Sequence, residues 1–154
     1  MPIDVRRVDG GAGETCRSIL AELPAWFGLP EANEGYVEHA DLHPGVIADD
    51  DGRAVGISTV VRHSPHAAEI HLMAVKPAAH RRGVGTSMLR VIESDLADEG
   101  VRFLQVKTLS ARHPDPGYAL TRRFYRAAGF VVLEEFPDLW GASNPALQLI
   151  KSIG

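Results

Sequence analysis

The sequence predicts a single α/β (α+β) domain, in which a mixed sheet of about seven strands carries about four helices. Three observations support this fold class. The chain has 154 residues, which suits one domain spanning residues 1–154. Its hydrophobic content of 45% and charged content of 23% are typical of a globular protein. Segments with strand-like alternation of apolar residues are interspersed with segments of helical spacing.

The first half of the chain predicts two helices and three strands. Alternating apolar residues indicate a strand at residues 3–8, and helical spacing that stops at Pro24 indicates a helix at 14–23. A weaker helical pattern covers residues 31–42. The turn Asp49-Asp50-Asp51-Gly52 then indicates a hairpin between strands at 46–48 and 54–61.

The second half continues with a strand at 67–75, followed by the clearest helix of the chain at 86–98. Met88, Leu89, Ile92 and Leu96 share one face of this helix, and Gly100 lies just beyond its end. The remaining patterns predict a strand, a helix and two further strands, at residues 102–109, 118–128, 130–136 and 146–151.

The segment His80-Arg81-Arg82-Gly83-Val84-Gly85-Thr86 joins strand 67–75 to helix 86–98. A basic, glycine-containing turn at a helix start suits a pyrophosphate group, because the first amides of a helix have no internal partner and the helix dipole favours an anion. An ordinary strand-to-helix turn is the alternative. A dinucleotide-binding unit is excluded, since the turn follows the fourth strand and lacks the third glycine of that motif.

The composition of the chain limits the classes of binding partner and the cellular compartment that we expect. A net charge of −4 argues against a nucleic-acid surface. No apolar run approaches the roughly 20 residues that span a bilayer, and the first residues lack a signal core, so no membrane association is expected. The single cysteine, Cys16, excludes an internal disulfide and suits the cytoplasm. The three adjacent aspartates lack the spacing of calcium ligands, and no metal is expected.

Three motifs together resemble the GCN5-related N-acetyltransferase (GNAT) superfamily. His80-Arg81-Arg82-Gly83-Val84-Gly85 resembles the family signature Gln/Arg-x-x-Gly-x-Gly/Ala that follows the fourth strand. The preceding Met73-Ala74-Val75-Lys76-Pro77 is similar to the end of that strand, and Phe124-Tyr125-Arg126-Ala127-Ala128-Gly129-Phe130 is similar to a Phe-Tyr-x-x-x-Gly-Phe block. The motifs occur in the family's order and spacing, and the order of the elements matches over nearly the whole chain.

The resemblance implies a mostly antiparallel sheet that splays between strands 4 and 5, with acetyl-CoA as co-substrate. It implies that the peptides of Met73, Ala74 and Val75 bind the pantetheine arm, that the strand bulges near Val75, and that an amide there stabilises the oxyanion. The segment 80–86 is expected to hold the pyrophosphate. Two residues depart from the family pattern. His80 replaces Gln or Arg, and Tyr118 stands where many members place an asparagine that contacts the cofactor.

Acetyl transfer from a thioester to an amine also needs a base and an acid. Glu69 and His71 lie two residues apart on one strand and therefore share a face, so both are candidates for the base. The resemblance to the histone-acetyltransferase branch favours Glu69, whereas the ordinary pKa of histidine favours His71. Tyr125 occupies the position of the family's tyrosine acid beside the thioester sulfur.

The acceptor is less well defined by the sequence. The aromatic pair Trp26 and Phe27 between the first two helices is interpreted as an acceptor wall or as core packing. We expect an N-acetyltransferase that acts on a primary amine, and we favour a small-molecule acceptor over a protein. The resemblance also implies that the protein can form a homodimer. An acyl-CoA-binding sensor without turnover is the alternative function.

Overall fold

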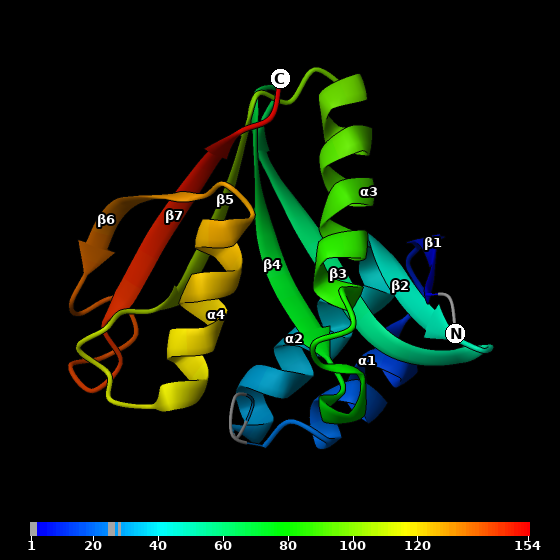
Figure 1. The fold of residues 1–154 in the computed structure, drawn as a ribbon, viewed down its shortest axis with the longest axis horizontal. Helices are drawn as coiled ribbons and strands as arrows, with labels where there is room; N and C mark the ends of the chain where they lie inside the picture. The colour runs from blue at the N-terminus through cyan, green and yellow to red at the C-terminus, as the bar shows by residue number, and fades with distance from the viewer. Residues whose placement is uncertain (1–2, 25–26, 28) are drawn as a thin grey trace.

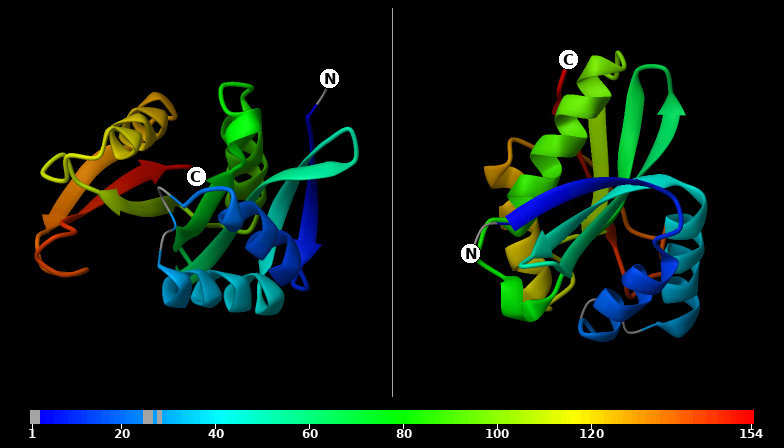
Figure 2. Two further views of the ribbon diagram at one scale, coloured as in Figure 1. Left: turned by 90° about the horizontal axis from the view of Figure 1, so that it is seen from below. Right: turned by 90° about the vertical axis from the view of Figure 1, so that its right-hand side faces the viewer.

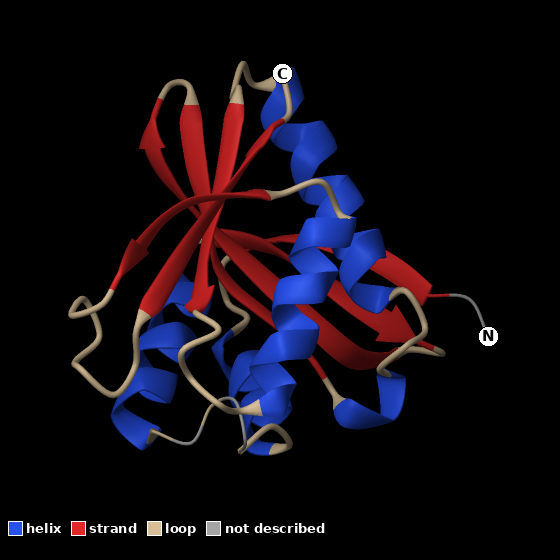
Figure 3. Ribbon diagram, turned by 60° about the vertical axis from the view of Figure 1, so that its left-hand side comes forward, coloured by secondary structure: helices blue, strands red, loops and turns tan. Residues whose placement is uncertain are grey.

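The structure is a computed structural model that describes residues 3–24, 27 and 29–154. It contains a seven-stranded sheet in the order β1-β2-β3-β4-β5-β7-β6. Helices cover both faces of this sheet, which is strongly twisted (Figure 3). The elements are β1 (Ile3–Asp9), α1 (Gly13–Ala21), α2 (Pro30–Leu42), β2 (Pro44–Asp50), β3 (Arg53–Ser64), β4 (Ala67–Val75), the 3₁₀ turn η1 (Pro77–Ala79), α3 (Val84–Asp98), β5 (Phe103–Leu109), α4 (Pro116–Ala127), β6 (Val131–Phe136) and β7 (Ala146–Ser152).

The predicted fold class and splay are confirmed. Neighbouring strands are antiparallel except β4 and β5, which run parallel. Their pairing covers only four residues of each strand and ends where Ile70 faces Val106. Beyond this point β4 continues to Val75 and β5 to Leu109, and the two strands diverge on either side of a gap in the sheet (Figure 1). We call this region the splay.

Two helical layers enclose the sheet and define two cores. Helices α3 and α4 lie over one face, and α1 and α2 lie over the other (Figure 2). The apolar stripe of α3, including Met88 and Ile92, packs into a core that also contains Tyr125 of α4. The opposite core contains Cys16 and Leu20 of α1. The side chain of Cys16 is fully buried, as expected for a small residue that fills a helix–sheet interface.

Local turn chemistry explains where the observed elements exceed the predicted ones. Asp51 and Gly52 both have positive φ values, 52° and 80°, as in the two-residue hairpin turn whose twist matches the strands. Strands β2 and β3 therefore extend directly to either side of this turn. Helix α4 begins two residues earlier than predicted, because the side chain of Asp115 caps it by accepting a hydrogen bond from the Gly117 amide at 2.8 Å.

Strand β4 carries a bulge at His71. Thr59 and Val60 of β3 are consecutive, yet they face Leu72 and Ile70 of β4, so His71 has no partner. Ile70 belongs to the core beneath α3, whereas Leu72 belongs to the core beneath α1 and α2. The expectation of a bulge near Val75 is thus wrong by four residues, because the extra residue is accommodated where β4 leaves β5 and is no longer held on both sides.

Helix α1 is capped by a residue of α2. Ala12 at its N-cap position has no side chain that can accept a hydrogen bond. The carboxylate of Asp41 instead accepts a hydrogen bond from the Gly13 amide at 2.7 Å, and the backbone oxygen of Asp41 accepts one from Gly11. This contact ties the two helices of one layer together.

We predict that Asp41→Ala lowers the free energy of unfolding by about 1–2 kcal/mol, because the α1 amide loses its acceptor. Asp41→Asn keeps an acceptor oxygen and serves as the matched control, with a smaller loss. Urea denaturation followed by circular dichroism measures both. Equal stability of Asp41→Ala and the wild type would contradict this role.

Candidate active site

The free edge of β4 defines the centre of the site. The Lys76 amide donates a hydrogen bond to the Val55 oxygen of β3 at 2.8 Å. Because successive residues of an antiparallel strand direct their backbone groups to opposite sides, those of Val75 and Met73 point away from β3 and into the splay. Strand β5 does not pair with this part of β4. A ligand placed in the splay therefore meets unpaired backbone donors and acceptors along a strand edge.

The side chain of His80 closes one end of this edge. Its Nε2 atom donates a hydrogen bond to the carbonyl oxygen of Val75 at 2.7 Å. The histidine that replaces the family's Gln or Arg at position 80 therefore has a structural role, because its imidazole links the end of β4 to the turn that follows. The Val75 amide still points toward the splay.

The turn between η1 and α3 has the backbone of an anion site. Gly83, at the N-cap of α3, has φ = 74° and no side-chain cap, and the first amide that bonds back to it is that of Ser87, at 2.9 Å. Arg81 also has a positive φ, 64°, which costs a non-glycine residue about 1–2 kcal/mol. A Cβ atom on Gly85 would lie 3.0 Å from the Phe124 ring, so glycine is needed there for the close approach of α3 and α4.

The side chains of this turn differ in what they contribute. Arg82 forms an ion pair with Asp50 of β2 at 2.5 Å, and its hydrogen bond lowers the pKa of Asp50. Val84 is 2% exposed and belongs to the core, so only its amide is available to a ligand. The backbone geometry around Gly83 fits a pyrophosphate group, with Arg81 as an exposed cation beside it.

Tyr125 lies at the other side of the sheet from the β4 bulge. It is 3% exposed and contacts the rings of Phe124 and Phe130 in edge-to-face geometry, at 5.1 and 5.4 Å between centroids. Burial raises the pKa of its hydroxyl above the ordinary value. Tyr125 therefore keeps its proton at neutral pH and is available as a proton donor.

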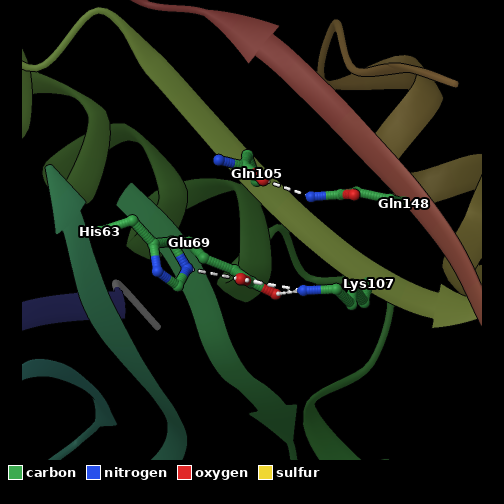
Figure 4. A network of polar contacts seen from close by, with 5 residues as sticks. All are labelled: His63, Glu69, Gln105, Lys107 and Gln148. Atoms are coloured by element: carbon green, nitrogen blue, oxygen red, sulfur yellow. Dashed lines mark hydrogen bonds and ion pairs between the residues drawn. The ribbon is translucent and has the colours of Figure 1, made fainter. Parts of the chain in front are cut away.

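Glu69 is held in a network of charged and polar contacts. Figure 4 shows it between His63 of β3, at 2.7 Å, and Lys107 of β5, whose Nζ atom lies 2.9 and 3.1 Å from the two carboxylate oxygens. Gln105 and Gln148 form a neighbouring hydrogen bond between β5 and β7. Burial raises the pKa of Glu69, but the hydrogen bonds from Lys107 and His63 outweigh it and bring the pKa below its ordinary value.

His71 has a different environment, although it shares a face with Glu69. Its ring lies 4.2 Å from that of His39 and 5.2 Å from that of Tyr36, both on α2. His71 is exposed on one side, but partial burial against the rings of α2 lowers its pKa below the ordinary value; Glu69 opposes this shift and His43 adds to it. The pKa of His39 is lowered to about 4, first by burial and then by the neighbouring histidines. His71 is thus neutral at pH 7 and able to accept a proton.

A shallow cavity of about 490 Å³, largely open to solvent, lies against these rings. It is lined by one face of α2 from Ala32 to Leu42, by His43 at the C-cap of this helix, and by His71 of β4. The rings of His39 and His43 stack at 28° and those of His39 and His71 at 33°, so their nitrogen lone pairs lie side by side and do not converge. Within the described residues, no group of three or more His, Cys, Asp or Glu side chains is arranged to hold a metal ion.

Sequence reasoning missed the residues of α2. Tyr36, His39 and His43 recur at intervals of three and four, which places them on one helix face. Phe27 contacts Tyr36 edge-to-face at 5.7 Å, so it supports this face from behind, while Trp26 lies outside the described residues. The available signal was the pair of histidines four residues apart, but nothing in the sequence indicates that His71 joins them.

Tyr118 borders the same region from α4. Burial raises its pKa, with smaller contributions from Asp115 and from Tyr36 of α2. Tyr118 of α4 therefore lies within electrostatic reach of Tyr36 of α2. A tyrosine thus stands at the edge of the site where many members of the resembled family carry an asparagine.

Comparisons with known proteins agree with this geometry. A family model described as an acetyltransferase (GNAT) domain matches residues 42–132. The N-alpha-acetyltransferase RimI of Mycobacterium tuberculosis (strain ATCC 25618 / H37Rv) is 37% identical over 81 residues, which are 48% of this chain and 51% of that protein. The chain therefore matches only about half the length of this relative.

Solved structures share the fold over almost their whole length. A GNAT-family protein from Desulfovibrio desulfuricans, described as a putative acetyltransferase, superimposes with a TM-score of 0.86 at 21% identity, over 99% of this chain and 100% of that one. An aminoglycoside 6'-N-acetyltransferase complexed with coenzyme A gives a TM-score of 0.76 at 17% identity, over 98% and 97%. Since the family model covers more than half of the sequence, the chain belongs to the GNAT family of acetyltransferases, whose members use acetyl-CoA.

Proposed function

We propose that this protein is an acetyl-CoA-dependent N-acetyltransferase that transfers an acetyl group directly to a primary amine. One observation carries the proposal: the unpaired edge of β4 in the splay lies between a turn whose backbone geometry fits an anion and two groups suited to proton transfer. Tyr125 belongs to the core under α3 and α4, and His71 lies on the opposite face of the sheet. A donor and an acceptor can thus approach the same strand edge from opposite sides.

The backbone would bind the acetyl donor. The peptides of Met73, Ala74 and Val75 are our candidates for the pantetheine arm, with those of Met73 and Val75 directed into the splay. The pyrophosphate would be held by His80, Arg81, Arg82, Gly83, Val84, Gly85 and Thr86, chiefly through amides at the start of α3. The Val75 amide is the candidate donor to the carbonyl oxygen as it gains negative charge.

His71 is the stronger candidate for the base. The acceptor arrives largely as an ammonium ion, so it must lose a proton before its nitrogen can attack. Glu69 is engaged by Lys107 and His63, whereas His71 is exposed, lines the cavity and stays neutral at pH 7. Proton transfer to His71, directly or through a water, uses a group that is available.

The proposed reaction balances with Tyr125 as the acid. The amine nitrogen attacks the thioester carbonyl carbon, a C–N bond forms and the C–S bond breaks. One ammonium proton leaves to His71 before the attack, the second N–H proton leaves the tetrahedral intermediate to solvent so that a neutral amide forms, and the departing thiolate receives the Tyr125 proton. Solvent then restores both groups to their starting state.

Two kinds of acceptor have support. The cavity of about 490 Å³ has the size of a small-molecule site, which favours a small amine. The RimI relative favours a protein N-terminal amine as the second candidate, because its name gives that activity. An acyl-CoA sensor would bind the donor but release no thiol when amines are added. Thiol release from acetyl-CoA with a panel of amines tests the proposed function against this alternative.

Gly83 provides the first prediction for this site. We expect Gly83→Asp to weaken acetyl-CoA binding about tenfold or more, since its carboxylate would repel the pyrophosphate. Gly83→Asn has nearly the same shape, tolerates positive φ and lacks the charge, so it should bind more tightly than Gly83→Asp. A Cβ atom at this position meets nothing within 4 Å, so both variants should fold. Calorimetry measures the affinities, and equal binding by the two variants would refute the anion site.

The second prediction for this site concerns Tyr125. Tyr125→Phe should reduce kcat about tenfold or more, as expected when a general acid is lost, and leave the affinity for acetyl-CoA unchanged. Phenylalanine keeps the ring packing against Phe124 and Phe130, so the thermal stability should be retained. Unchanged kcat would remove Tyr125 from the mechanism.

The third prediction for this site concerns the base and distinguishes His71 from Glu69. In the wild type, kcat/KM should fall as the pH drops through the pKa of His71, because protonation removes the base; this pKa lies below the ordinary 6.5, so activity should persist at pH 6.5. His71→Gln should lower kcat about tenfold or more and abolish this acid limb. Glu69→Gln should retain the limb. If the acid limb is lost in Glu69→Gln and intact in His71→Gln, the base is Glu69 and not His71.

A further inference from the structure

The cavity beside His71 points to the chemical class of the acceptor. We propose that this cavity binds the body of the acceptor, and that the acceptor is a small primary amine that carries a planar aromatic ring and no anionic group. This inference rests on the proposed function, because it assigns the substrate of the same site.

Aromatic and imidazole rings form a continuous column along the cavity. Phe27, Tyr36, His71, His39 and His43 follow one another, with neighbouring centroids 5.7, 5.2, 4.2 and 4.3 Å apart. The last four belong to the cavity lining. Planar rings offer flat, polarisable surfaces, on which another ring stacks or meets an edge more favourably than a saturated group of equal size.

Small residues of α2 leave the space that a ligand would fill. Ala32 and Gly35 lie on the same lining, one turn apart. A Cβ atom built on Gly35 meets nothing within 4 Å, so the glycine faces open space. Glycine in a helix interior is unfavourable, and α2 gains no packing from it. The combination fits a site that is kept open beside a wall of rings.

The charge of the lining selects against anions. Among the described lining residues, Glu38 is the one carboxylate, and no lysine or arginine takes part. The lowered pKa values of His39 and His71 keep their imidazoles neutral. A carboxylate or phosphate on the ligand would therefore meet Glu38 without a compensating cation, whereas an ammonium group is attracted by the carboxylate and by the ring faces.

His71 connects this cavity to the chemistry. It lines the cavity, and it is also the first residue of β4 beyond the last pair with β5. An amine on a short linker from a ring seated against α2 would therefore arrive at the opening of the splay. The cavity volume leaves room for a small molecule of this kind.

Three matched amines test the assignment with the wild-type protein and acetyl-CoA. 2-Phenylethylamine and 2-cyclohexylethylamine differ in ring unsaturation, and phenylalanine adds a carboxylate to the first. We expect kcat/KM for 2-phenylethylamine to exceed that for the cyclohexyl compound about three- to tenfold, which is the range expected for an aromatic pair. Phenylalanine should be the poorest of the three. Equal rates for the phenyl and cyclohexyl amines, or a preference for phenylalanine, would overturn the inference.

Variants of α2 test whether the preference for the phenyl amine arises at the cavity lining. Tyr36→Phe keeps a ring in the wall and should keep the preference for the phenyl amine, whereas Tyr36→Leu should reduce it to near unity. Gly35→Leu should raise KM for 2-phenylethylamine about tenfold, because the side chain enters the open space; leucine is also the better helix former. Glu31→Leu places the same side chain on α2 outside the lining and should leave KM unchanged. Equal effects of Gly35→Leu and Glu31→Leu would contradict a bound acceptor.

The outcomes separate this inference from the proposed function. If the protein binds acetyl-CoA and releases thiol with a peptide N-terminal amine but not with aromatic amines, the acceptor class is wrong and the acetyltransferase assignment stands. If no amine in the panel promotes thiol release, both fall. A calorimetric measurement of acetyl-CoA binding in every variant confirms that the donor site is intact.

Discussion

The short pairing between β4 and β5 is the constraint on which the site depends. Two parallel strands that continued side by side would satisfy each other's backbone groups and leave no room for a ligand. Here the ladder ends at Ile70 and Val106, and β4 runs on for five residues along an edge that β5 does not pair. Unpaired backbone groups in a folded protein are costly unless a partner satisfies them. A substrate that binds in extended form along β4 supplies such a partner, so the gap in the sheet has a physical reason.

The bulge at His71 gives this gap two chemically different sides. Inserting one residue shifts the alternation of β4, so that Ile70 and Leu72 are both buried but in opposite cores. The extra residue is left exposed at the entrance to the splay, where α2 can reach it. Without the bulge, position 71 would be an ordinary ladder residue. Tyr125, buried under α3 and α4, completes the arrangement from the other side.

The sequence predicts most of the fold because its elements are marked locally. The stripe of α3 from Val84 to Leu96, the Asp51-Gly52 turn and Gly129 after α4 each act within a few neighbouring residues. The motif around Gly83 likewise indicated the turn. The site is harder, because its decisive contacts join distant segments. Lys107 engages Glu69 across 38 residues, and His39 meets His71 across 32. No spacing rule within one element reveals either contact, although they decide which candidate base is free.

The electrostatics of the turn follow from the same kind of long-range pairing. Counting charges along the sequence assigns two arginines to the pyrophosphate, yet Arg82 is bonded to Asp50 of β2. This pair orients the turn against the sheet, and it offsets part of the positive charge that the two arginines bring to the turn. The anion site then depends more on the backbone, in which Arg81 and Gly83 adopt left-handed conformations immediately before α3. Side-chain charge adds to this geometry but cannot replace it, because only fixed amides define where a pyrophosphate sits relative to the edge of β4.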